Sequence, residues 1–197
     1  MKAVMPAVPP PIRQWRKQTG ADRWDEMWEG VLHMAPVPNR SHQDFQWALE
    51  TWLRNHWGEP GANRVYHEIN VASVGGWPDD YRVPDLVLLT PDRFDIDHNE
   101  YFEGAPAVVV EIRSPDDESY EKLPFYAKLG VPEVWVIDRD RRTPEVYVLA
   151  SGDYAEQTPD KEGWVASALC GIQMRSDPSG RLEIQLAANP QTRRLLP

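Results

Sequence analysis

The alternation of apolar and polar positions divides the chain into strands, two helices and the turns between them. Segments rich in β-branched and aromatic residues predict strands, and these segments span residues 64–73, 83–89, 105–114, 132–138 and 143–150. The runs VPDLVLL and APAVVVEIRS are mostly apolar, which is typical of buried strands. Residues 23–38 predict a turn with a strand or hairpin around Gly30, and residues 164–168 and 181–187 predict further strands near the C-terminus.

Two segments have helical spacing instead. Residues 41–57 place large apolar side chains on one face of a helix, with Ser41 as the candidate N-cap. Residues 114–130 predict a second helix that stops at Gly130 and, because Pro124 lies inside the pattern, either starts late or kinks there. The strand, helix, strand order over residues 105–138 favours a right-handed crossover within one sheet. The fold class is therefore α/β or α+β with a mixed sheet.

Length and composition limit the organisation. At 197 residues and 41% hydrophobic content, we expect one domain over residues 21–190, an extended proline-rich arm over residues 1–20 and a tail over residues 191–197. The single cysteine, Cys170, excludes an intramolecular disulfide framework and a thiolate zinc cluster, which favours the cytoplasm. No signal peptide or membrane span is expected.

The net charge of −10 argues against a surface that binds nucleic acid by counterion release alone. The basic stretches at residues 139–142 and 193–194 are expected to be a solvated turn and part of the tail. The sequence contains no repeat, phosphate-binding glycine loop, nucleophile elbow or zinc motif. Nucleotide hydrolysis and serine-type hydrolysis therefore lose support.

Acidic residues next to apolar runs carry the chemistry that the sequence suggests. Asp85 lies in VPDLVLL and Glu111 in AVVVEIRS, and two carboxylates on neighbouring buried strands are costly unless a cation or a proton is shared between them. Glu68, on the preceding strand, is either a further ligand or a surface acid. Two carboxylates and the backbone carbonyl of Ile112 would suit Mg²⁺ or Mn²⁺. The alternative for Glu111 is a structural ion pair with a basic neighbour.

The order of these motifs resembles a known family. Pro84-Asp85, then E-x-R at residues 111–113, K-x-x-x-Y at residues 122–126 and GVPEVWVID at residues 130–138 resemble the Uma family of putative restriction endonucleases, within the PD-(D/E)XK nuclease superfamily. The resemblance covers residues 24–149 and includes EMWEGVLHMAP and the helix that contains His42. It implies a restriction-endonuclease-like core of mixed strands flanked by helices, to which this chain adds C-terminal strands.

The resemblance also implies roles for individual residues. Asp85, Glu111 and the Ile112 carbonyl would hold Mg²⁺ or Mn²⁺ at a catalytic centre that cleaves phosphodiester bonds. Arg113 stands where the family pattern expects lysine, and it can steady a phosphate but can hardly act as a general base. Lys122 would take over the electrostatic or water-orienting role.

Other residues near these motifs have ordinary explanations. His42 is expected to cap or pack the first helix, Tyr126 to lie in the core or to hold Lys122, and Glu26 and Glu29 to assist the site at most.

Three functions remain open from the sequence. The first is a metal-dependent endonuclease that acts on nucleic acid, expected to be a homodimer because related nucleases cut two strands. The second is an inactive or diverged nuclease fold that serves as a protein-interaction module, which the missing lysine and the acidic composition favour. The third is a metal-dependent hydrolase of a small phosphate ester.

Overall fold

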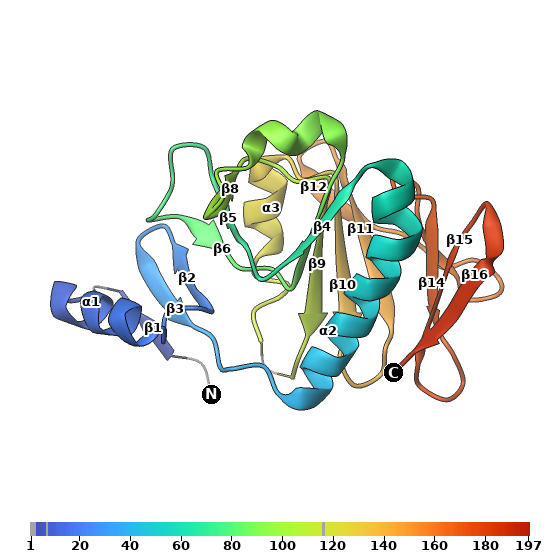
Figure 1. Cartoon of the computed structure of the whole chain (residues 1–197), viewed down its shortest axis with the longest axis horizontal. Coiled ribbons are helices and arrows are strands. Elements are labelled where there is room, and N and C mark those ends of the chain that lie inside the picture. The colour runs from blue at the N-terminus through green and yellow to red at the C-terminus, as the bar shows by residue number, and fades with distance from the viewer. Residues whose placement is uncertain (1–2, 7, 116) are drawn as a thin grey trace.

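A mixed six-stranded sheet forms the centre of the molecule (Figure 1), in a computed structural model that describes residues 3–6, 8–115 and 117–197. Its spatial order is β12 (Asp153–Glu156), β11 (Pro144–Ala150), β10 (Glu133–Asp138), β9 (Val108–Arg113), β7 (Leu86–Leu89) and β4 (Arg64–His67). Strands β9 and β10 run parallel and are joined through helix α3 (Leu123–Leu129), while the other neighbours in this sheet are antiparallel. The predicted crossover within one sheet and the central place of the valine-rich strand are confirmed, while the right-handedness of the crossover stays a prediction.

Helices cover both faces of this sheet. Val108, Val110 and Ile112 pack in the main core cluster with residues of helix α2 (Arg40–Leu53). Val109, on the opposite face of β9, packs with Phe125 of α3. Each fully buried Val, Leu or Ile side chain contributes about 1.5–3 kcal/mol, so the alternation along β9 fixes which face each helix covers. Helix α2 continues into the π-helical turn η1 (Arg54–Gly58) and the 3₁₀ turn η2 (Glu59–Gly61).

Two further sheets flank the central one. The first has the order β1 (Ala3–Met5), β3 (Val31–Met34), β2 (Asp25–Trp28), β6 (Tyr81–Arg82), β5 (Asn70–Ala72) and β8 (Tyr101–Glu103), with the 3₁₀ segment η3 (Pro91–Ile96) before β8. The C-terminal sheet contains β13 (Val165–Ser167), β14 (Ile172–Ser176), β15 (Leu182–Leu186) and β16 (Asn189–Leu196). Its inner side chains join α2 in the main core cluster. The extra C-terminal strands predicted from sequence are thus present.

The predicted hairpin forms from β2 and β3. Its two-residue turn uses Glu29 and Gly30, whose φ angles of 48° and 85° give the backbone twist that tight hairpins favour. Strand β2 then pairs with β6 through Met27 and Tyr81. The hairpin is therefore anchored in the flanking sheet, beside the central one.

Both ends of the chain differ from expectation. Residues 10–19 form helix α1 (Pro10–Thr19) instead of an extended arm, because proline in the first helical turn lacks an N–H that would have no partner there. Residues 1, 2 and 7 of the predicted arm lie outside the described residues. The predicted tail, residues 191–197, largely belongs to strand β16, which pairs with β15.

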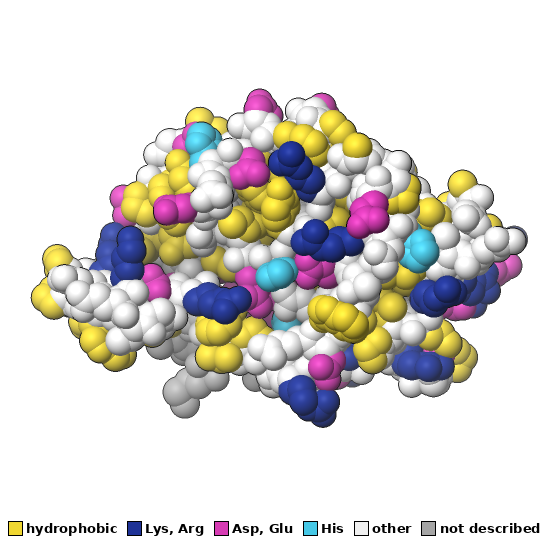
Figure 2. Space-filling model, in the orientation of Figure 1, with side chains coloured by type: hydrophobic (Ala, Val, Ile, Leu, Met, Phe, Trp, Pro, Cys, Tyr) yellow, Lys and Arg dark blue, Asp and Glu magenta, His cyan; other side chains and the backbone are white. Residues whose placement is uncertain are grey.

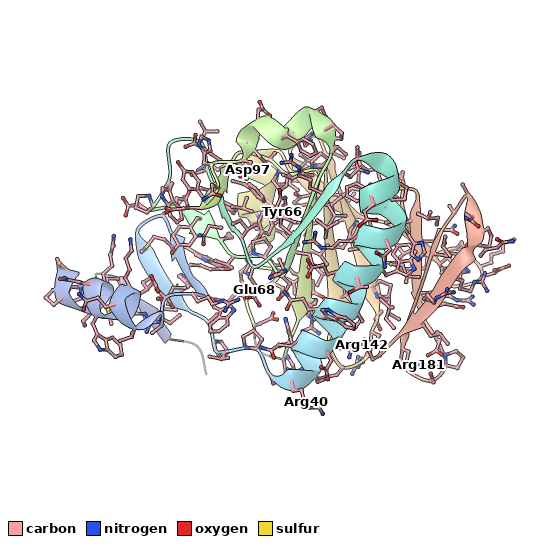
Figure 3. All side chains as sticks on the ribbon, in the orientation of Figure 1. Arg40, Tyr66, Glu68, Asp97, Arg142 and Arg181 are labelled. Atoms are coloured by element: carbon pink, nitrogen blue, oxygen red, sulfur yellow. The ribbon has the colours of Figure 1, made fainter. Side chains whose placement is uncertain are left out.

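Three local predictions are also corrected or settled. The strand expected over residues 64–73 breaks at Glu68, whose φ is 49°, so that β4 joins the central sheet and β5 the flanking sheet. Figure 3 shows Glu68 after β4, in the region between the β2–β3 hairpin and α2. The N-cap of α2 is Asn39, whose side chain accepts a hydrogen bond from the His42 backbone, and not Ser41. Helix α3 starts late, with Pro124 in its first turn.

No helix within the described residues is long and apolar enough to cross a bilayer.

Candidate functional site

A cavity of about 550 Å³ opens where the hairpin, the start of α2 and the ends of β7 and β9 meet. The loop between β9 and α3 and the residue after β10 complete its lining. Figure 2 shows this face between the N-terminal elements and α2, with acidic and histidine side chains gathered beside basic ones. Two sheets, helix α2 and the loop before α3 therefore contribute side chains to one concave site.

Asp85 lies in this cavity, one residue before β7, and its carboxylate is held on both sides. His42 of α2 lies with Nε2 2.7 Å from Oδ1, and the backbone N–H of Ile112 donates to Oδ2 at 2.6 Å. The Asp85 carbonyl accepts from the Gln46 side chain and from the Glu68 backbone. These contacts fix the carboxylate beside the end of β9.

Because β7 and β9 are antiparallel and pair Leu86 with Val110, Asp85 and Glu111 come next to each other in the register. Glu111 belongs to the cavity lining, and its side chain is only 4% exposed. Tyr126 donates a hydrogen bond to Oε1 at 2.7 Å, and the Lys122 ammonium donates to Oε2 at 3.1 Å. The sequence prediction of two acids on neighbouring strands is therefore confirmed, and each of the four carboxylate oxygens has a protein partner.

Lys122 precedes α3 and lies between two carboxylates. Its Nζ is 2.7 Å from Glu26 Oε1 and 3.1 Å from Glu111 Oε2. Glu26 belongs to β2 and is itself fixed, since Trp28 Nε1 donates to Oε2 and the Val83 backbone donates to Oε1. We call Glu26, Glu111, Lys122 and Tyr126 the Lys122 cluster. It joins the flanking sheet to the central sheet through buried charge.

Burial and neighbouring charges shift the pKa values in this cluster. Desolvation raises the pKa of Glu111 to about 8; Lys122 opposes this shift, whereas the negative charges of Asp85 and Glu26 add to it. For Lys122, desolvation alone would lower the pKa, but the two carboxylates outweigh it and hold the pKa above its usual range. Burial and the Glu111 charge likewise raise the pKa of Tyr126. Lys122 is thus a permanent cation, and Glu111 readily keeps a proton.

His42 responds to its partner in the same way. Burial alone would lower its pKa, but the hydrogen bond and the charge of Asp85 raise it above the ordinary value. The positive charge of Arg139 opposes this effect.

Of the remaining residues predicted for the site, Arg113 and Glu68 are not among the residues that line the cavity, and Ile112 is. Arg113 donates to Asp138 at 3.1 Å, its guanidinium lies 5.4 Å from the centre of the Tyr120 ring, and it is not among the residues that line the cavity. Glu68 pairs with Arg23 and is also absent from the lining, so the structure does not bring these two residues together with Asp85 and Glu111 in the cavity. Ile112 does line it.

Three residues that were not predicted as principal site residues also belong to the cavity. His42, Glu26 and Arg139 all line the cavity, from α2, β2 and the turn after β10. For Glu26, the sequence signal was the EMWEG segment of the hairpin, which is part of the family resemblance. His42 and Arg139 come from segments far apart in the chain, and their meeting depends on tertiary packing.

The basic stretch at residues 139–142 is not simply a solvated turn. Besides Arg139 in the cavity, Arg142 is buried, with its guanidinium 4.0 Å from the centre of the Phe45 ring. Figure 3 labels it beside α2.

Comparisons with known proteins agree with this architecture. A family model for Uma2, described as "Putative restriction endonuclease", matches residues 13–176. A solved structure, described as a putative nuclease belonging to DUF820 from Anabaena variabilis ATCC 29413, has a TM-score of 0.58 and 22% sequence identity. The similarity covers 74% of this chain and 83% of that one, and at this identity it shows a shared fold. No curated protein matches the chain. The family match spans most of the sequence, so this chain belongs to the Uma2 family of putative restriction endonucleases.

Proposed function

We propose that the chain is a metal-dependent endonuclease that hydrolyses phosphodiester bonds in nucleic acid. The observation that carries this proposal is the meeting of Asp85, Glu111 and Lys122 in one cavity, from the residue before β7, from β9 and from the residue before α3. Membership of the Uma2 family and the nuclease-like fold support it.

The donor set fits a hard divalent cation. Within the described residues, no group of three or more His, Cys, Asp or Glu side chains is placed to hold a metal. Mg²⁺, however, is usually held through one or two carboxylates, with waters and substrate phosphates completing its shell. Each carboxylate oxygen retains a lone pair beside the hydrogen bond that it accepts here. Asp85, Glu111 and the Ile112 carbonyl would hold the Mg²⁺ or Mn²⁺.

The charge balance supports the same conclusion. Among the described residues, five carboxylates line the cavity, against the two cations Lys122 and Arg139 and two histidines. Desolvation and the negative charges of Asp85 and Glu26 keep the pKa of Glu111 raised to about 8 even beside Lys122, so a further cation would favour its ionised form. A bound divalent cation would lower the pKa of an attacking water and offset charge that develops on the phosphate.

The protein's own groups then have distinct tasks. His42 and the Ile112 N–H orient Asp85, and Tyr126 orients Glu111. Lys122 keeps its proton, so it supplies positive charge and does not act as a general base. We propose no direct contact of Arg113 with the reacting phosphate, because its guanidinium pairs with Asp138 outside the cavity lining.

The test combines metal binding with cleavage. We expect Mn²⁺ titration calorimetry to show binding that Asp85→Asn and Glu111→Gln abolish, and expect Mg²⁺-dependent nicking of plasmid or single-stranded nucleic acid that the same variants lose. Lys128→Ala is the matched control for Lys122→Ala, because Lys128 lies in the same segment with its side chain 76% exposed.

Each other outcome has a definite meaning. A wild-type protein that binds no Mn²⁺ refutes the metal site. Metal binding without cleavage of any nucleic acid supports the diverged interaction module, or, if a small phosphodiester is hydrolysed, the small-ester hydrolase. The expected homodimer is tested in the same samples by sedimentation.

A further inference from the structure

We infer that Arg139 binds a phosphate of the nucleic acid substrate at the mouth of the cavity, with the Ser114 hydroxyl as a second donor. This inference rests on the proposed nuclease function and names the group that recognises the substrate backbone. From its sequence context alone, Arg139 is expected in a solvated turn.

The position of Arg139 is set by the parallel pair β9 and β10. Arg113 and Asp138 are paired at the carboxyl ends of these two strands, so the residues that follow them leave the sheet at the same end. The Arg139 backbone N–H donates to the Arg113 carbonyl at 2.9 Å, and its Nη1 donates to Ser114 Oγ at 3.2 Å. Arg139 and Ser114 therefore line the cavity together. The same cavity is lined by Asp85 and Glu111, the proposed metal ligands.

Arg139 has hydrogen-bonding capacity left for a ligand. A guanidinium carries five N–H donors. Three of them are used in the described structure, two by Asp140 and one by Ser114. Asp140 holds the guanidinium through a bidentate pair, while Nη1 and Nη2 each keep one further N–H beyond these bonds in the described structure, so a phosphate can bind there without displacing Asp140. The Ser114 oxygen accepts from Arg139, so its own hydrogen is directed elsewhere.

Lys122, the other lysine or arginine in the described lining, is already committed. Its side chain is 12% exposed and lies against two buried carboxylates, so a phosphate would have to displace one of them. An excess of carboxylates also repels any anion that enters. Arginine offers planar, paired donors that match phosphate oxygens, which makes Arg139 the group best suited to admit the substrate backbone.

The experiment compares Arg139→Ala, Arg139→Lys and the control Arg141→Ala in the full chain. Arg141 belongs to the same turn, has an exposed side chain and contacts its neighbours through its backbone nitrogen and oxygen. Its replacement removes the same charge without touching the cavity. The binding probe is a fluorescein-labelled single-stranded DNA oligonucleotide, measured by anisotropy with Ca²⁺ in place of Mg²⁺, beside a peptide nucleic acid of the same sequence that lacks phosphates.

We expect Arg139→Ala to weaken DNA binding and to raise KM by about 10- to 100-fold, the loss expected for hydrogen bonds to a charged group. Arg139→Lys should be intermediate, because lysine keeps the charge but loses the paired donors. Arg141→Ala should stay within about twofold of the wild type, as for a surface substitution. The Mn²⁺ affinity and kcat should change little in all three variants.

The remaining outcomes separate this inference from the proposed function. If the wild type cleaves DNA and Arg139→Ala equals Arg141→Ala, Arg139 has no such role, while the nuclease proposal stands. An equal loss for the peptide nucleic acid also overturns the inference, since no phosphate is then recognised. If the wild type neither binds nor cleaves nucleic acid, both proposals fail. Should Arg139→Ala not fold, the comparison of Arg139→Lys with the wild type decides.

Discussion

The hydrogen bond from Tyr126 to Glu111 provides a quantitative test of the Lys122 cluster. Both side chains are fully buried, and the 2.7 Å bond reaches a carboxyl group whose pKa is raised to about 8. A hydrogen bond to a charged group contributes about 1.5–3 kcal/mol, and one to a neutral group about 0.5–1.5 kcal/mol. We therefore expect Tyr126→Phe to lower the free energy of unfolding by about 1.5–3 kcal/mol at a pH above the Glu111 pKa, where the carboxylate is charged, and by about 0.5–1.5 kcal/mol at a pH below it.

The assay is urea denaturation of metal-free protein in a double-mutant cycle with Glu111→Gln, at one pH on each side of the Glu111 pKa. The coupling energy should increase as Glu111 ionises. The matched control is Tyr154→Phe, because the Tyr154 hydroxyl donates to the neutral Val131 carbonyl at 2.8 Å. This control should be additive with Glu111→Gln. A Tyr126 coupling below about 0.5 kcal/mol at both pH values, the usual limit of additivity, would refute the reasoning.

Three further predictions concern stability. Lys122→Met should lower the free energy of unfolding, measured with denaturant, by about 3–5 kcal/mol, since it leaves two buried carboxylates without their cation. Lys128→Met, at an exposed position, should lower it by less than about 0.5 kcal/mol. Asn39→Ala should lower the free energy of unfolding by about 1 kcal/mol because it removes the N-cap of α2, and Ser41→Ala should lower it much less. Equal effects of the two substitutions in thermal melts would contradict Asn39 as the cap. In metal-free protein, the stabilising contribution of Glu111 to the free energy of unfolding is fully present below its ordinary pKa of 4.5 and is lost as the pH rises through about 8, because the folded state holds the proton more firmly. Urea denaturation over this pH range should therefore show a free energy of unfolding that falls with pH in the wild type, and Glu111→Gln should remove this fall.

The central sheet could be predicted from sequence because burial and periodicity act locally. The valine run of β9 and the VWVI run of β10 are too short to span a membrane and too apolar for a surface, so a buried sheet was the natural interpretation. The placement of Glu111 on the same face of β9 as Val109 followed from alternation alone. Local patterns did not predict the break at Glu68, because a non-glycine residue with positive φ leaves no clear signal in composition.

The candidate site could be predicted only in part, for a different physical reason. Asp85 and Glu111 stand out because an acid in an apolar run is costly. Apart from the family resemblance, which takes in Glu26 and the helix of His42, the sequence around Glu26, His42 and Arg139 gives no sign of a site, and their place in the cavity arises from contacts between segments distant along the chain. The helix at residues 10–19 was missed because the three consecutive prolines at residues 9–11 suggest extended chain, although the N-cap and the first helical turn accommodate them.

Glu26 reaches the Lys122 cluster from a sheet other than the one that carries Asp85 and Glu111. The site is therefore modular: the central sheet provides the two acids, and the hairpin restrains the lysine. Local opening of the hairpin would leave Lys122 paired with Glu111 alone, and its ammonium would then be free to reach an anion. Substitutions in the β2–β3 turn, remote from any reacting atom, would in this way alter the charge presented to a substrate while the central sheet remains intact.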